Sequence, residues 1–182
     1  WNTAYEAQGS LPANASQRPR TMDGVVTPAY FQTLRIPLLE GRDFSEGDTR
    51  PTSAPVIVVS QSFARATWRG ESAIGRRVRL LRRGAGEAPW REVVGVVGDT
   101  RVSTFAPERG WVYVPHGQPA FTELVLVMRF NGDHAGLIRD VRRLVWEVEP
   151  ALPLHWNDLL ADLIARRYWQ PRAYSILFSV FS

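Results

Sequence analysis

Two patterns of apolar residues alternate along the chain, one with the period of a β-strand and one with the period of an α-helix. The strand-like runs are short and rich in valine, and Gly, Pro, Asn or Ser residues separate them. Strands are predicted at 1–9, 22–26, 55–59, 76–81, 90–98, 111–114, 123–130 and 152–156. The alternation with helical segments predicts an α+β (mixed α/β) fold.

Capping residues and prolines predict where the helices begin and end. Thr27-Pro28 predicts the start of a short helix that Pro37 ends, and Ser60 predicts the N-cap of a helix that runs through Trp68. The clearest helix follows 131–133 and stops at Pro150. We expect its apolar stripe to pack on a sheet. That stripe comprises Leu137, Ile138, Val141, Leu144, Val145 and Val148.

The opposite face of this last helix carries an aromatic residue among arginines. Trp146 lies there beside Arg139, Arg142 and Arg143. An exposed tryptophan next to arginine is typical of an interface anchor, so these four residues form a candidate interface. A second element covering the same face is the alternative reading.

Composition indicates a chain that folds. Of 182 residues, 45% are hydrophobic and 22% are charged, and the chain has no cysteine. Disulfides, thiol catalysis and thiolate metal sites are therefore excluded. At this length one compact domain or two small ones are expected.

All 22 basic residues are arginine, and the formal net charge is +4. A Walker A phosphate loop needs lysine, so this segment is not expected to bind ATP in that way. The glycines of Gly95-Val96-Val97-Gly98 lie in a valine-rich strand, where they favour close backbone packing. The sequence has no G-x-S-x-G or H-E-x-x-H motif, and we expect no catalytic, cofactor-binding or metal-binding residues.

Two weaker candidates for metal binding have plain structural explanations. The histidines lie in separate predicted elements, and an acidic turn has a spacing that does not match a calcium loop. We expect turn or core-edge histidines and a solvated turn. The residues concerned are His116, His134, His155, Asp43, Glu46 and Asp48.

One cluster of arginines gives an alternative function. Five of them fall within eight residues on a predicted hairpin, a pattern that fits either a solvated sheet edge or a basic module contacting an anionic polymer or lipid. The absence of a recognised nucleic-acid-reading motif argues against nucleic acid as the partner. The cluster is Arg76, Arg77, Arg79, Arg82 and Arg83.

The C-terminal segment has the composition of a membrane boundary. Arginines and aromatic residues come before and at the start of an apolar run over 173–182 that is too short to span a bilayer. It is either the first half of a transmembrane helix or an amphipathic helix packed on the domain. The membrane-proximal candidates are Arg166, Arg167, Tyr168, Trp169, Arg172 and Tyr174.

Five segments at 26–44, 56–65, 74–78, 93–99 and 112–118 follow one another in a recognisable order. Together they resemble the MacB-like periplasmic core domain of ABC transporter permeases, within the FtsX-like permease family. Three positions depart from the family pattern: Arg35 stands where the family usually has glycine, Ser60 where asparagine is common, and Arg69 where proline is common. The resemblance also implies that the chain is a fragment of a larger permease.

The resemblance implies a two-lobed extracytoplasmic domain, with a porter-like strand-helix-strand lobe and a second small mixed-sheet lobe inserted into it. We expect 1–27 plus 119–158 to form the first lobe, 28–118 the second, and 159–182 a stalk and the start of a transmembrane helix.

By the same resemblance, the domain is not an enzyme. It would couple ATP-driven motion of transmembrane helices to export or envelope work, on the periplasmic side of the bacterial cell (inner) membrane. The implied partners are a cytoplasmic ABC ATPase, the membrane, a second permease subunit in a homo- or heterodimer, and a periplasmic adaptor.

Overall fold

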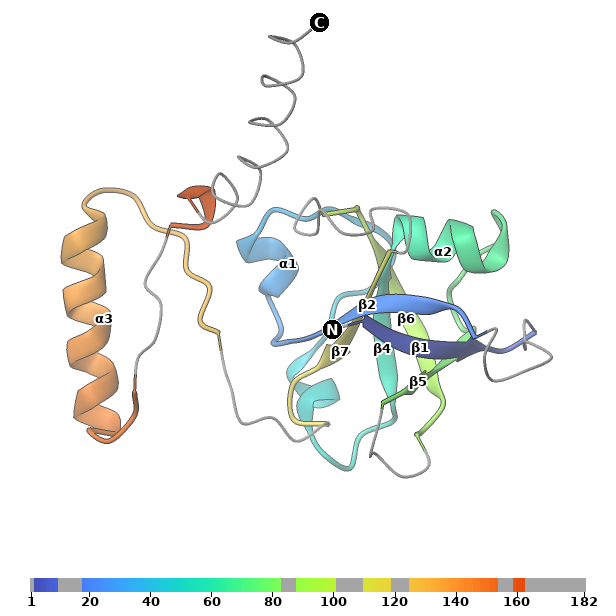
Figure 1. Cartoon of the computed structure of the whole chain (residues 1–182), viewed down its shortest axis with the longest axis horizontal. Helices are drawn as coiled ribbons and strands as arrows, with labels where there is room; N and C mark the ends of the chain where they lie inside the picture. Colours follow the sequence, from blue (N-terminus) through green and yellow to red (C-terminus); the bar gives the residue numbers. More distant parts are fainter. Residues whose placement is uncertain are drawn as a thin grey trace, which may run out of the picture. The chain divides into compact units, whose positions relative to one another are not determined.

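A computed structural model of the chain describes residues 2–9, 18–82, 88–100, 110–118, 125–153 and 159–162. The chain divides into two compact units, residues 1–129 and 130–182, which are described separately (Figure 1). The elements of the first unit are β1 (Asn2–Ala7), β2 (Arg20–Val26), α1 (Tyr30–Thr33), β3 (Leu38–Gly41), the 3-10 turn η2 (Glu46–Thr49), β4 (Val56–Ser60), α2 (Gln61–Trp68), β5 (Arg77–Leu81), β6 (Arg91–Val97) and β7 (Trp111–Pro115). The second unit contains α3 (His134–Val148). This is a mixed α/β fold with one sheet and few helices.

The sheet closes on itself. Its strand order is β3-β6-β4-β7-β2-β1-β5, and β5 also pairs with β6. β4 pairs along the whole of one edge of β6. The other edge of β6 is shared by two strands: β5 pairs with the first residues of β6, and β3 pairs with its last residues. Six strands therefore form a closed barrel, and β3 extends the sheet beyond the point of closure. Closure leaves few unpaired strand edges, which would otherwise invite aggregation.

The two faces of the sheet bury separate hydrophobic clusters, as the two-residue period of a strand requires. On β4, Ile57 and Val59 pack with Phe63 and Trp68 of α2. Val56 and Val58 point to the other face, where Phe31 of α1 and Phe44 cover them. The valine-rich run at 55–59 was predicted to be a buried strand, and all five residues of β4 are buried.

Helix α2 begins and ends as its sequence predicts. The Ser60 hydroxyl accepts a hydrogen bond from the Phe63 amide at 3.3 Å, which is the expected N-cap. Arg69 then adopts a left-handed conformation with φ of 49°, and Gly70 follows with φ of 94°. Two successive residues with positive φ end the helix there.

The start of α1 differs from the prediction. Its N-cap is Ala29, in a left-handed conformation with φ of 66°, and no side chain caps the helix. The Tyr30 amide donates to the Thr27 carbonyl at 3.3 Å, so Thr27-Pro28 forms a turn before the helix. Proline suits the second position of such a turn as well as the first turn of a helix, which explains the error.

Strand β3 was not predicted. Its four residues are all exposed, and turn-forming residues flank them. Its position depends on glycine. A Cβ on Gly41 would lie 2.2 Å from the Val94 carbonyl oxygen, and one on Gly95 would lie 2.2 Å from the Arg42 carbonyl oxygen. Gly95 thus permits close approach of two backbones, as its place in a valine-rich strand indicated, whereas the same role of Gly41 was not predicted.

The strand predicted at 123–130 is absent from the described part of that range, residues 125–130, which have no regular structure. Val125 and Leu126 are 77% and 62% exposed. Residues 152 and 153 likewise lie in no strand, and the rest of the predicted closing strand is outside the described residues.

Helix α3 has nearly the predicted bounds, and the Asp133 carboxylate caps it by accepting from the Ala135 and Gly136 amides at 3.0 and 2.7 Å. None of its residues is buried. The expected packing of its apolar stripe on a sheet is therefore not found in the described residues. The periodicity that predicts an amphipathic helix does not specify what covers it.

The first 26 residues contribute to the same sheet as the region between Leu38 and Pro115. β2 pairs in parallel with β7, and β1 pairs with both β2 and β5. The lobe limits at 27/28 and 118/119 stay a prediction. In the parts of the chain that the structure describes, no helix is long and apolar enough to cross a bilayer.

Candidate functional site

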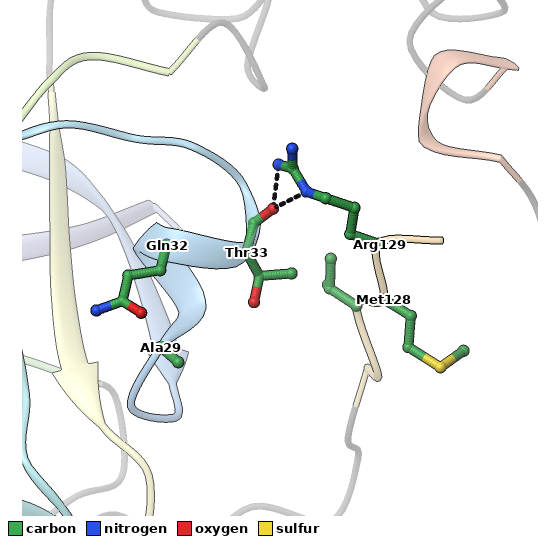
Figure 2. Close-up of a pocket in the computed structure, with 6 residues that line it drawn as sticks. Ala29, Gln32, Thr33, Met128 and Arg129 are labelled. Carbon is green, nitrogen blue, oxygen red and sulfur yellow. Dashed lines mark hydrogen bonds between the residues drawn. The ribbon is translucent and has the colours of Figure 1, made fainter. Parts of the chain in front are cut away.

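One hollow of the first unit lies between α1 and the segment 127–129 and has a volume of about 490 Å³. Its lining residues are Ala29, Gln32, Thr33, Val127, Met128 and Arg129. Figure 2 shows the Arg129 side chain reaching the last residue of α1, where its guanidinium donates twice to the Thr33 carbonyl, with the Nε bond at 3.0 Å. A cation at this position satisfies a free carbonyl at the helix C-terminus.

The lining of this hollow suits packing rather than chemistry. It contains no carboxylate or imidazole, and the guanidinium is engaged by the helix end. The lining offers apolar atoms, the Thr33 hydroxyl and the amide of Gln32. This hollow was not predicted, because residues 123–130 were expected to form a strand. The one sequence feature that could have indicated it is Arg129, a cation able to bind the carbonyl at the end of the short helix α1.

Three arginines of the cluster at 76–83, in and beside β5, are paired with carboxylates. Arg79 donates to Glu6 through Nε at 3.0 Å, and Arg82 donates to Asp23 at 2.6 Å. Arg76 forms an ion pair with Glu71. Arg77 is exposed, and Arg83 lies outside the described residues.

These pairs hold neighbouring strands together. Glu6 on β1 is 5% exposed and also accepts from Arg18 at 2.8 Å. The hydrogen bond from Arg79 is the main reason that the pKa of Glu6 is lowered. Arg79 also lies 4.9 Å from the centroid of the Trp90 ring, a cation–π distance.

Asp23 on β2 is the most deeply buried carboxylate of this group, with 1% of its surface exposed. It accepts from the Thr3 hydroxyl on β1 at 2.6 Å as well as from Arg82. A buried charge is tolerated only when it is paired and hydrogen-bonded. The cluster therefore has a structural role in closing the barrel, which weakens the alternative of a basic polymer-binding hairpin.

The acidic turn is held by an arginine. Arg42 donates to both oxygens of Asp48, at 2.7 and 3.0 Å, and the Ser45 amide and hydroxyl donate at 2.8 and 2.7 Å. These bonds lower the pKa of Asp48 to about 2, and the hydrogen bonding from Arg42 is the largest cause. Asp48 is 8% exposed, so at this residue the turn is not the solvated one that was expected, because Arg42 and Ser45 hold its carboxylate inside the protein.

Gln118 connects this turn to the end of β7. Its amide nitrogen donates to the carbonyl oxygens of Asp48 at 2.9 Å and Ala54 at 3.2 Å, and its amide oxygen accepts from Arg91. Burial lowers the pKa of Arg91, and the nearby Arg82 charge adds to this. Two segments of the family-like pattern, through Arg42 and Gln118, thus meet in one hydrogen-bonded network.

The histidines do not converge in the described residues. His116 lies in the turn after β7, His134 begins α3 and stacks on Phe130 at 5.9 Å between ring centroids, and His155 is outside the described part of the chain. The described ranges hold no group of three side chains able to bind a metal ion.

The candidate interface on α3 is exposed. Trp146 is 46% exposed, and its indole nitrogen donates to the Leu152 carbonyl at 3.4 Å. The Arg142 guanidinium lies 5.7 Å from the Trp146 ring centroid, and Arg143 forms an ion pair with Asp140 at 3.0 Å. Among the predicted interface residues Arg139, Arg142, Arg143 and Trp146, only the contact of Arg142 with Trp146 is seen in the described residues, and the role of the set as an interface stays a prediction. The membrane-proximal candidates over 166–174 lie outside the described residues.

Two crystal structures share this fold. The periplasmic region of MacB from Actinobacillus actinomycetemcomitans has a TM-score of 0.54 at 17% sequence identity, with 81% of this chain and 63% of that chain covered. A domain of a putative permease protein from Porphyromonas gingivalis has a TM-score of 0.51 at 15% identity, with 90% and 77% covered. The chain thus spans less than two thirds of the MacB region. No curated protein is a significant sequence match.

The family comparison agrees with the order of segments found in the sequence. Residues 3–142 match the model of the MacB-like periplasmic core domain, which is most of the chain and includes the whole barrel. The chain belongs to the MacB-like periplasmic core domain family.

Proposed function

We propose that this chain is the extracytoplasmic domain of an ABC-type permease subunit and that it transmits the motion of transmembrane helices to export or envelope work. ATP would be hydrolysed by a separate ATPase domain or subunit on the cytoplasmic side. The observation that carries this proposal is the family match over residues 3–142.

The construction of the first unit supports a mechanical role. Ion pairs between β1, β2 and β5 and the network around Asp48 connect strands that are distant in sequence. A barrel held in this way moves as a rigid body, and transmission of motion requires rigid elements joined by few hinges. The described site residues contribute binding and support, with no reactive pair among them.

The finer organisation belongs to the same proposal. In it, 1–27 and 119–158 form a porter-like lobe, 28–118 form the inserted lobe, and 159–182 lead into the membrane. The permease would act as a homo- or heterodimer in the bacterial inner membrane, with a periplasmic adaptor as a further partner. The compact units have other limits, 1–129 and 130–182, and the barrel lies within the first of them. The relative movement that coupling needs would therefore be between the barrel and the unit that contains α3.

The test is a distance measurement in the full-length permease with its ATPase. These 182 residues contain no cysteine, so Ala66→Cys on α2 and Glu147→Cys on α3, both exposed, give specific spin-labelling positions once any cysteines elsewhere in the permease and the ATPase are replaced by serine. Pulsed electron–electron double resonance would measure the distance between the two labels in the nucleotide-free state and in the vanadate-trapped state. We expect the distance distribution between the two labels to shift.

A control pair within the first unit, Ala66→Cys with Glu46→Cys, should give the same distribution in both states. If the distribution between Ala66 and Glu147 is also unchanged while ATP is hydrolysed, the domain does not transmit the motion and the coupling proposal is wrong.

A further inference from the structure

Four side chains of α3 form a continuous stripe along one side of the helix. Arg139, Arg142, Arg143 and Trp146 have spacings of three, four and seven residues, which places them on one face about 10 Å long. Arg139, Arg143 and Trp146 are exposed, and Arg142 is half-buried against the ring. We call this set the arginine–tryptophan stripe.

The stripe has a surplus of positive charge. Arg143 is paired with Asp140, but neither Arg139 nor Arg142 forms a salt bridge with a carboxylate within the described ranges. The Nε atom of Arg142 is buried and has no hydrogen-bond acceptor there. The arginines of the barrel differ, since Arg42, Arg79 and Arg82 each hold a carboxylate.

The tryptophan is fixed in position. Its indole nitrogen is hydrogen-bonded to the Leu152 carbonyl, and the Arg142 guanidinium lies over its ring. A large, partly exposed aromatic side chain with little freedom loses little entropy on binding, and Trp and Arg are the residues most enriched at the energetic centre of protein interfaces. Planar guanidinium groups bind carboxylates through two parallel hydrogen bonds.

A protein partner fits this arrangement better than a membrane surface. A helix that lies in a bilayer interface places its tryptophan with its apolar residues. In α3 the apolar stripe from Leu137 to Val148 is on the opposite side of the helix from Trp146. Insertion of the apolar side would point the tryptophan away from the lipid.

We propose that the arginine–tryptophan stripe binds an acidic protein segment, with carboxylates on Arg139 and Arg142 and an apolar or aromatic side chain against Trp146. This inference does not depend on the coupling role proposed above. It assigns a partner chemistry to one face of the domain.

The test uses the whole chain and a short fluorescein-labelled peptide that has acidic residues on both sides of one phenylalanine. Fluorescence anisotropy should show binding that weakens with salt. Arg139→Gln with Arg142→Gln, and separately Trp146→Ala, should each weaken binding by about tenfold or more. Glutamine is a good helix former, so circular dichroism should show α3 intact.

A charge-matched control is Arg65→Gln with Arg77→Gln, two exposed arginines of the first unit, which should leave the affinity unchanged. Equal loss in this control would mean that only net charge matters, which overturns the proposal. Three other results also overturn it. These are unchanged binding in the stripe variants, stripe-dependent binding to phosphatidylserine vesicles without peptide binding, and stripe-dependent self-association in sedimentation equilibrium, which would make a second copy the occupant.

Discussion

At the scale of single residues, Arg35 occupies a left-handed backbone conformation, with φ of 54°, just after α1. Residues other than glycine lose about 1–2 kcal/mol there because Cβ approaches a carbonyl oxygen. Glycine has no Cβ and adopts this conformation without that cost. We expect Arg35→Gly to raise the free energy of unfolding by about 1 kcal/mol, after allowance for the greater freedom of glycine in the unfolded chain. Guanidinium chloride unfolding measures the change.

Arg35→Ala is the matched control, because it removes the same side chain but keeps Cβ. It should leave the free energy of unfolding nearly unchanged. An equal gain in both variants would show that loss of the guanidinium, and not relief of the backbone, is the cause.

The pair of Arg42 and Asp48 predicts how stability depends on pH. Bonding to Arg42 lowers the pKa of Asp48 from 3.8 to about 2. Because the folded-state pKa lies below the unfolded value, the pair contributes stability above about pH 4, and this is lost as the pH falls towards 2. The loss is up to about 2 kcal/mol, and Glu6 adds to it in the same direction. In Arg42→Gln, the free energy of unfolding measured in urea should change less between about pH 4 and about pH 2 than in the unaltered chain. An equal change in both proteins would contradict the role given to the Arg42–Asp48 pair.

At the scale of elements, the contact between β3 and β6 depends on the absence of a side chain at Gly95. A Cβ there would lie 2.2 Å from the Arg42 carbonyl oxygen, so the backbones must separate. We expect Gly95→Ala to lower the free energy of unfolding by about 2 kcal/mol or more. Gly47→Ala, whose nearest neighbour is 3.4 Å away, should change it by less than about 0.5 kcal/mol. Equal effects of the two changes, measured by urea unfolding, would mean that close packing at Gly95 is unimportant.

The elements that were predicted from sequence share a strong local signal. β4 is a run of apolar residues, α2 begins at a capping serine, and α3 has a clear helical period, so each is specified by its own residues. β3 was missed because its pairing depends on two glycines distant in sequence, Gly41 and Gly95. Closure of the barrel was likewise not predictable, since β5 pairs with β1 across about seventy residues.

The candidate sites also divide into those with a local sequence signal and those that depend on residues distant in sequence. The position of Trp146 opposite the apolar stripe could be predicted from helical spacing, but its exposure could not, because no residue of α3 is buried on either side. The partners of Arg79 and Arg82 could not, because Glu6 and Asp23 are brought beside them only when β1, β2 and β5 assemble. A run of arginines in a sequence gives their charge but not their partners.

At the scale of the whole molecule, pairing of the arginines changes what a net charge of +4 means for binding. Arg82 neutralises the buried Asp23, and its loss would leave that carboxylate with less compensation. We expect Arg82→Gln to lower the free energy of unfolding by about 2–4 kcal/mol. The salt dependence of binding to duplex DNA should stay that of the unaltered chain. A reduced salt slope with unchanged stability would support the basic-module alternative instead.

The two units should also differ in how often they open. Both hydrophobic clusters lie in the first unit, where β4 is entirely buried, whereas no residue of α3 is buried. Amides in buried strands exchange with solvent only on global unfolding, and amides in an uncovered helix exchange through local opening. In the 182-residue chain we expect α3 amides to exchange at least about 100-fold faster than those of β4, as hydrogen exchange with mass spectrometry would show.

In the full permease, partners that cover α3 should slow the exchange of its amides and leave the exchange of β4 amides unchanged. Equal protection of α3 and β4 in the isolated chain would mean that the helix is already covered, and its arginine–tryptophan stripe would then not be free for another protein.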